Sequence, residues 1–187
     1  MRVSFVNKLL EKATNNKKII LLTGDLGFGV LREYIEKLPN QFLNCGIAEA
    51  SMLSFAGGLA KGGYTPVVYS IGNFPTLRAL EQIRNDICYP NSNVKIICIG
   101  GGYTYGSLGM SHHALEDIAM LRALPNMHIF TPSNKEESIF VSNYMFEIDG
   151  PCYLRLERDS NPNVKNNLKN YEIGAPLCYA FSNKNTA

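Results

Sequence analysis

The sequence predicts an α/β domain, a three-layer sandwich in which helices cover both faces of a central, mainly parallel β-sheet. Short apolar runs rich in Val and Ile alternate along the chain with longer segments of helical periodicity, which is typical of parallel strands joined by helices. The run at 94–99 is apolar at nearly every position, as expected for a central strand that is buried on both faces. With 187 residues, the chain is long enough for one domain with a substantial core.

Charge and composition exclude several classes of function. The net charge is +2 and the 18 basic residues are scattered, so the sequence shows no electrostatic footprint for nucleic acid. No apolar run approaches the roughly 20 residues that a membrane-spanning helix needs. The five cysteines are widely spaced and include no Cys-x-x-Cys pair, which argues against a disulfide framework and a zinc site. We therefore expect a cytoplasmic protein that binds neither nucleic acid nor membrane.

The first half of the chain is expected to contain three helices and three strands. The helices span residues 3–13, 30–37 and 48–60, and the strands span 18–23, 41–44 and 64–70. The first strand runs into the glycine-rich turn Gly24-Asp25-Leu26-Gly27-Phe28-Gly29. This turn should lie at the carboxyl edge of the sheet, where open α/β sheets bind their ligands.

In the second half, a loop carrying Asn73, Phe74 and Pro75 is expected to lead into an amphipathic helix at 76–87. Its inward residues should be Leu77, Leu80, Ile83 and Ile87, and its outward residues Arg78, Glu81 and Arg84. Further strands are expected at 94–99, 127–131 and 151–156, with helices at 114–123 and 134–146. The glycine-rich segment 100–113 is long for a loop in a compact domain, so we expect it to be functional.

Glu49 is a lone acid in the segment Asn44-Cys45-Gly46-Ile47-Ala48-Glu49 and falls in the first turn of the helix at 48–60. Its neighbours in the sequence are small and apolar, and a carboxyl group in dry surroundings holds its proton more tightly. This makes Glu49 a candidate proton donor. An acid at this position also complements the helix dipole, so a purely structural role explains the same pattern.

The adjacent histidines His112 and His113 follow the glycine-rich segment. Such a pair is suited to binding a polar substrate or moving protons, although capping of the helix at 114–123 is an equally good interpretation. As metal ligands they are poor, because neighbouring side chains point apart and no third ligand has suitable spacing. We expect no metal site within this chain.

Several motifs, taken in order, resemble the pyrimidine-binding domain of the transketolase family over roughly residues 15–175. They are Gly46-Ile47-Ala48-Glu49, Ala60-Lys61-Gly62-Gly63-Tyr64, Glu81-Gln82-Ile83-Arg84-Asn85-Asp86, Ser111-His112, Ala114-Leu115-Glu116-Asp117-Ile118-Ala119-Met120-Leu121-Arg122 and Thr131-Pro132-Ser133. The resemblance implies the thiamine-diphosphate-binding (pyrimidine) fold. It implies a pyrimidine-binding domain at 1–170, and at 171–187 the start of a linker to a missing C-terminal domain, as in the second half of a split transketolase.

The resemblance also implies which residues bind the cofactor. Glu49 corresponds to the catalytic glutamate that contacts N1′ of the aminopyrimidine ring of thiamine diphosphate and shares a proton there. Phe74 lies where the family places an aromatic residue against the pyrimidine. Asp25 lies in a turn similar to the family's Gly-x-Asp-Leu, near the cofactor, although a structural turn aspartate fits as well.

Three further residues are implied to bind substrate. His112 matches a substrate-binding histidine with a catalytic role, and His113 lies beside it. Arg158 falls near the family's sugar-phosphate arginine, and a guanidinium is well suited to phosphate. The family's Glu-Asp-Gly before this histidine is here Ser107-Leu108-Gly109, which leaves the donor and acceptor sugars open.

The family motif that holds the diphosphate through Mg²⁺ or Ca²⁺ is absent from this chain. The resemblance therefore implies a companion subunit that supplies this site, in a homodimer or heterotetramer acting on a sugar or sugar phosphate. The expected function is the pyrimidine-binding half of a transketolase-like enzyme that transfers a ketol unit. Alternatives are a 2-oxo-acid dehydrogenase β-subunit, a 1-deoxyxylulose-5-phosphate synthase-like enzyme, or a noncatalytic assembly or ligand-binding domain of the same fold.

Overall fold

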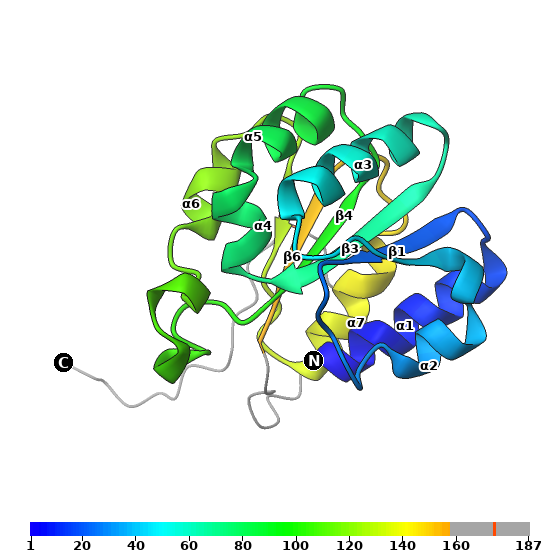
Figure 1. Cartoon of the computed structure of the whole chain (residues 1–187), viewed down its shortest axis with the longest axis horizontal. Coiled ribbons are helices and arrows are strands. Elements are labelled where there is room, and N and C mark those ends of the chain that lie inside the picture. Colours follow the sequence, from blue (N-terminus) through cyan, green and yellow to red (C-terminus); the bar gives the residue numbers. More distant parts are fainter. Residues whose placement is uncertain (158–173, 175–187) are drawn as a thin grey trace, which may run out of the picture.

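A computed structural model describes residues 1–157 and residue 174 (Figure 1). Within these residues six strands form one sheet in the order β2-β1-β3-β4-β6-β5, and all five pairings are parallel. The strands are β1 (Ile19–Thr23), β2 (Phe42–Asn44), β3 (Thr65–Ile71), β4 (Lys95–Ile99), β5 (His128–Phe130) and β6 (Cys152–Leu156). The predicted fold class is confirmed.

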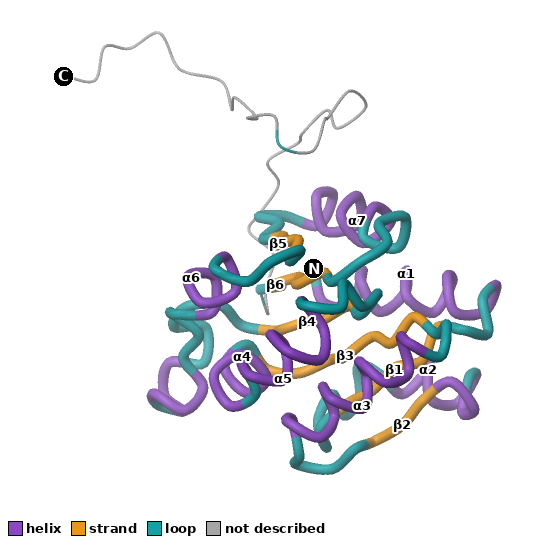
Figure 2. The backbone as a smooth tube through the Cα atoms, turned by 90° about the horizontal axis from the view of Figure 1, so that it is seen from above, coloured by secondary structure: helices purple, strands orange, loops and turns teal. Residues whose placement is uncertain are grey.

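Helices cover both faces of the sheet, as Figure 2 shows from above. The helices are α1 (Arg2–Asn15), α2 (Arg32–Lys37), α3 (Glu49–Lys61), α4 (Asn73–Arg78), α5 (Leu80–Gln82), α6 (Asp117–Arg122) and α7 (Lys135–Tyr144). Short 3₁₀ turns occupy Pro39–Gln41, Gly106–Leu108 and Met110–His112, and Ile83–Cys88 is a π-helical segment. Side chains of α1, α2 and α7 pack on one face of the sheet, and those of α3, α6 and the π-helical segment pack on the other.

The core divides into two clusters because successive strand residues point to opposite faces. In β4, Ile97 and Ile99 face the cluster under α1 and α7, whereas Ile96 and Cys98 face the cluster under α3. All five residues of β4 are buried. The near-continuous apolar run in the sequence is therefore explained by a central strand that is covered on both sides.

The loop expected at 73–75 and the single helix expected at 76–87 are both wrong. Residues 73–78 form α4, whose first turn accommodates Pro75 because N–H groups there have no partner within the helix. The helix ends at Ala79, which leaves helical geometry at φ −129° and ψ 33°. This break changes the direction of the side chains, so Leu77 is 46% exposed instead of facing inward.

The glycine-rich segment 100–113 is ordered by two 3₁₀ turns and by a bridge between its ends. Gly102 and Ala114 exchange backbone hydrogen bonds of 2.8 and 3.0 Å. Because Ala114 takes part in this bridge, α6 begins at Asp117, later than predicted.

In the part of the chain that the structure describes, none of the helices has the length and apolar character required to cross a membrane. Arg158 lies outside the described residues, as do the expected domain boundary at 170 and, apart from Gly174, the expected linker.

Candidate active site

The carboxyl ends of the parallel strands bring the predicted site residues to one edge of the sheet. Gly24 and Asp25 follow β1, Glu49 follows β2, and Phe74 follows β3. His112 lies in the segment after β4. Such an edge is where open α/β sheets bind their ligands, because the loops there converge.

Glu49 is the first residue of α3 and is buried, with 1% of its surface exposed. Its Oε2 accepts a hydrogen bond of 2.8 Å from Nη1 of Arg78. Its Oε1 is also buried, but it has no hydrogen-bond partner among the described residues. A buried polar atom normally has such a partner, so Oε1 is a vacant acceptor, or a donor when the carboxyl group is protonated.

Gly24 leaves room beside this oxygen. A Cβ atom at Gly24 would lie 3.8 Å from Oε1 of Glu49 and 3.3 Å from the carbonyl oxygen of Gly46. Any larger side chain would therefore fill the space next to the vacant carboxyl oxygen.

Arg78 is the residue of the candidate site that sequence reasoning missed, since it was expected to face outward. Its side chain is 56% exposed, yet its guanidinium binds Glu49 and lies 5.5 Å from the centre of the Phe74 ring. Phe74 and Arg78 are four residues apart, and this spacing places two side chains on one face of a helix. The four-residue spacing could have predicted that Phe74 and Arg78 lie together only if the helix had been known to begin at residue 73.

Phe74 also contacts His112, with ring centroids 5.0 Å apart in an edge-to-face arrangement. The His112 ring lies 5.9 Å from that of Tyr105 as well. The amide of Asn73 donates hydrogen bonds to the carbonyl oxygens of Ser111 (2.9 Å) and Met110 (3.3 Å), which fixes the turn of His112 against α4. A continuous series of contacts thus joins Glu49, Arg78, Phe74 and His112.

His113 points away from His112, as expected for neighbouring residues. Its Nε2 lies 3.1 Å from the carbonyl oxygen of Gly106, and its ring packs edge-on against Tyr103 at 4.9 Å. Among residues 1–157, no group of three His, Cys, Asp or Glu side chains is placed to hold a metal ion.

Asp25 fixes the backbone around the Glu49 helix. It has a positive φ of 57°, a conformation that Asp tolerates better than most residues. Its N–H donates to Oδ1 of Asn44 at 2.9 Å, and its Oδ1 accepts from Nδ2 of Asn44 at 3.0 Å. The same Asn44 oxygen accepts from the N–H of Gly46. These bonds tie together the turns after β1 and β2, so Asp25 has a clear structural role.

A buried network anchors the segment that carries His112. Asp117 accepts hydrogen bonds from the hydroxyl of Tyr153 at 2.6 Å and from Nη1 of Arg155 at 3.2 Å. Burial raises the pKa of Tyr153 well above its usual value, so the phenol stays a donor. Separately, the single hydroxyl proton of Thr104 is shared between Oε2 of Glu157, at 2.5 Å from Oγ1, and the carbonyl oxygen of Gly101, at 2.8 Å. The start of the glycine-rich segment is thereby held against β6.

Comparisons with known proteins show the family to which the chain belongs. Residues 1–163 match the family described as transketolase, pyrimidine binding domain. The chain is 38% identical over 89% of its length to one of the subunits of apulose-4-phosphate transketolase from Phocaeicola vulgatus, and it covers 54% of that relative. It is 34% identical over 93% of its length to a putative transketolase C-terminal section from Methanocaldococcus jannaschii, of which it covers 56%.

Among solved structures, the chain is similar to a split gene transketolase described as an inactive β4 tetramer. The TM-score is 0.78 and the identity 36%, over 88% of this chain and 53% of that one. The chain thus spans about half the length of these relatives. From the family match over residues 1–163 and the shared fold, we conclude that the chain belongs to the transketolase pyrimidine-binding domain family.

Proposed function

We propose that this chain is the pyrimidine-binding subunit of a two-subunit, thiamine-diphosphate-dependent transketolase-like transferase that moves a ketol unit between sugars or sugar phosphates. One observation carries the proposal: Glu49, at the position of the family's catalytic glutamate, is buried and keeps one carboxyl oxygen without a partner among the described residues. An acid in this state is ready to share a proton with a nitrogen atom of a ligand.

The residues around Glu49 suit an aminopyrimidine. Oε1 offers the hydrogen-bonding group, Phe74 offers an aromatic surface, and Gly24 leaves space beside the carboxyl group. Thiamine diphosphate, when bound, supplies a carbon nucleophile and an electron sink. Glu49 holds and shares the proton at Oε1, while the bond from Arg78 to Oε2 fixes the orientation of the carboxyl group.

The other predicted site residues complete the proposal. Asp25 lies near the cofactor in the turn that it stabilises. His112 contacts the substrate and takes part in catalysis, with its ring oriented by Phe74. His113 and Arg158 bind the polar or phosphorylated end of the sugar.

A companion subunit supplies the site for the diphosphate and its Mg²⁺ or Ca²⁺, so turnover requires both chains. We further propose that this chain associates with itself, in a homodimer alone or a heterotetramer with its companion. The β4 tetramer of the split gene transketolase supports this proposal, as that relative assembles with itself. The four described cysteines are free, and a reducing compartment, the cytoplasm, remains the proposed location.

One observation favours a noncatalytic assembly or ligand-binding domain as the second candidate. Leu108, at the place where the family usually has an acid for a donor hydroxyl, is 55% exposed. Such a domain would bind the cofactor or the companion without turnover. The alternative enzymes of the same chemistry, a 2-oxo-acid dehydrogenase or a 1-deoxyxylulose-5-phosphate synthase-like enzyme, differ in the substrate accepted.

The test is reconstitution with the companion subunit, thiamine diphosphate and Mg²⁺, followed by measurement of ketol transfer from a panel of sugar and sugar-phosphate donors. We expect turnover only when both chains and the cofactor are present. Glu49→Gln should lower the rate at least about 100-fold, the usual contribution of general acid–base catalysis. Glu81→Gln, at an exposed position of α5, is the matched control and should keep the rate. Cofactor binding without turnover on any donor would favour the noncatalytic domain.

A further inference from the structure

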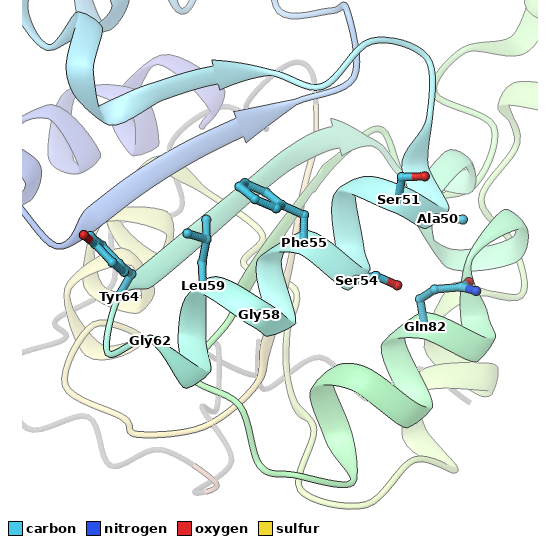
Figure 3. Close-up of a pocket in the computed structure, with 9 residues that line it drawn as sticks. All are labelled: Ala50, Ser51, Ser54, Phe55, Gly58, Leu59, Gly62, Tyr64 and Gln82. Carbon is cyan, nitrogen blue, oxygen red and sulfur yellow. The ribbon is translucent and has the colours of Figure 1, made fainter.

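Outside the candidate active site, the described residues include a hollow without charge and a buried pair of reactive groups. The hollow lies on the outer face of α3 and is lined by nine residues, none of which carries a charged side chain (Figure 3). The buried pair is an amine and a thiol, because Nζ of Lys95 lies 3.3 Å from Sγ of Cys152. The proposed ketol transfer uses neither group of this pair.

The pairing of β4 with β6 brings the amine and the thiol together. Lys95 and Cys152 are the first residues of these strands and are direct partners in the parallel register. Both side chains are completely buried. Cys152 faces the cluster under α1 and α7, and Lys95, two positions before Ile97, points to the same face. The pair therefore lies at the amino edge of the sheet, opposite the candidate active site.

The amine of Lys95 is held in one orientation. Nζ lies 2.8 Å from the carbonyl oxygen of Ile148 and 2.9 Å from that of Gly150. Burial lowers the pKa of Lys95 and raises the pKa of Cys152, so both effects favour a neutral amine beside a neutral thiol. A neutral amine has two hydrogen atoms, which the two carbonyl groups accept. Its lone pair then points to the third neighbour, Sγ of Cys152.

The neighbouring amine distinguishes Cys152 from other buried cysteines. Cys88 and Cys98 are as completely buried, but among the described cysteines only Cys152 contacts an amine. A buried thiol without such a neighbour is ordinarily inert. Hydrogen peroxide is small and uncharged, so it can reach a buried site when the chain opens locally. Cys88 and Cys98 thus serve as internal controls for a reaction at Cys152.

We propose that hydrogen peroxide links Lys95 to Cys152 through a reversible N–S bond. In the first step Sγ attacks one peroxide oxygen, the S–O bond forms and the O–O bond breaks. The other oxygen leaves as water with the thiol proton, so the sulfur is oxidised by two electrons and the peroxide is reduced. In the second step the lone pair of Nζ attacks the sulfur, the S–N bond forms and the S–O bond breaks. The hydroxyl group leaves as water with one amine proton, as when a sulfenic acid condenses with a backbone nitrogen.

The link changes the hydrogen bonds of the segment between α7 and β6. The linked nitrogen keeps one N–H group, so the carbonyl groups of Ile148 and Gly150 can no longer both accept a hydrogen bond from it. We expect this segment to loosen while β4 and β6 become joined covalently. An added thiol reverses the link, because it attacks the sulfur, the amine leaves, and a second thiol molecule then restores Cys152 as the added thiol is oxidised to its disulfide.

Peroxide treatment of the full chain, followed by catalase and mass spectrometry, tests the proposal. We expect the wild-type chain to lose two hydrogen atoms, and tryptic digestion to release a linked peptide that joins Lys95 to Cys152. Dithiothreitol should restore the original mass, and hydrogen exchange at residues 146–151 should be faster in the linked chain. Cys152→Ala should abolish the link, whereas Cys88→Ala, the matched control at an equally buried position, should keep it. Circular dichroism checks the fold of both variants.

The peptide map of the wild-type chain decides the outcome even if a variant fails to fold. A Cys152 that stays reduced, or is oxidised to sulfinic or sulfonic acid without a linked peptide, would overturn the proposal. So would a link that forms equally in a chain unfolded with urea, because the contact in the fold would then not be its cause. A loss of two hydrogen atoms that persists in Cys152→Ala would assign the change to a disulfide elsewhere and also contradict the proposal. These measurements need neither cofactor nor companion, so they are independent of the ketol-transfer test.

Discussion

Glu49 and Arg78 form an unequal ion pair, in which a buried carboxylate depends on a cation that is half in solvent. Removing a carboxylate from water is unfavourable unless a partner compensates. Arg78 compensates through one oxygen only, and the other is left for a ligand. Because the Arg78 side chain is 56% exposed, solvent screens the attraction, and its contribution to stability should be modest.

Arg78→Ala should therefore destabilise the chain by about 1–2 kcal/mol, mostly because the Glu49 carboxylate loses its compensation. Urea unfolding measures the change. Arg122→Ala, at an exposed position of α6, is the control and should change stability by less than about 0.5 kcal/mol.

A double-mutant cycle identifies the cause. A neutral amide at position 49 carries no buried charge for Arg78 to compensate. The loss of unfolding free energy caused by Arg78→Ala should therefore be smaller in the Glu49→Gln background. If Arg78→Ala destabilises both backgrounds equally, the ion pair does not explain its effect.

At this scale the sequence predicted some of the residues that the structure brings together. Glu49 and His112 follow from motifs that are local in the chain, and the contact between Phe74 and His112 agrees with their expected nearness to one ligand. Arg78 could not be predicted from the amphipathic pattern, because its partner lies 29 positions away and its helix begins at Asn73 and ends before Ala79.

At the scale of the elements, the segment 100–113 gains its order from packing against β6. A Cβ atom at Gly101 would lie 2.5 Å from Nε of Arg155 and 2.7 Å from Oε1 of Glu157. Both side chains are held, Arg155 by Asp117 and Glu157 by Thr104. The close approach of this backbone to β6 therefore requires glycine.

Gly101→Ala should destabilise the chain by about 1–3 kcal/mol, since the added methyl group forces apart side chains that are already bonded. Gly106→Ala is the matched control, as a Cβ atom at Gly106 meets open space. Urea unfolding compares the two variants, and hydrogen exchange of the segment reports local loosening. Equal stability of the two variants would show that the segment is not held in this way.

The same elements show why sequence reasoning succeeded for strands and failed for some helices. The sheet followed from apolar runs such as β4, whose pattern reflects burial on both faces. Ile83 and Ile87 are buried, as expected for the helix at 76–87. That single helix was nevertheless wrong, because the chain breaks at Ala79 and Leu77 faces outward. The spacing of apolar residues predicts which side of a helix is buried. It does not show where the helix is interrupted, and an interruption changes which residues face the core.

At the scale of the whole molecule, three tyrosines among residues 1–157 are almost fully buried, with Tyr34 and Tyr69 in the cluster under α1 and Tyr153 in the cluster under α3. Burial raises the pKa of all three above the usual value for tyrosine. Each therefore keeps its proton in the folded chain at pH values where the unfolded chain loses it.

Stability should consequently fall as the pH rises above about 10, the ordinary pKa of tyrosine, because the folded state then binds more protons. Burial also raises the pKa of Cys88, Cys98 and Cys152, so the decline should already begin near pH 9, where thiols of the unfolded chain lose their protons. The burial of Lys95 lowers its pKa and acts in the opposite direction, but the buried phenols and thiols outnumber it. Urea unfolding at about pH 8 to about pH 11 measures the slope.

Tyr69→Phe should make the decline shallower, whereas Tyr103→Phe, at an exposed position, should leave it unchanged. A stability that does not fall across this range would contradict the account of the buried phenols.

The central claim concerns one proton at Oε1 of Glu49, and exchange of the C2 hydrogen of thiamine diphosphate for deuterium in the assembled two-chain complex tests it most directly. The rate, followed by quenched-flow NMR, should fall at least about 100-fold in Glu49→Gln if Glu49 shares that proton with the cofactor. Equal exchange rates in Glu49→Gln and the wild type, with the cofactor bound in both, would contradict the claim.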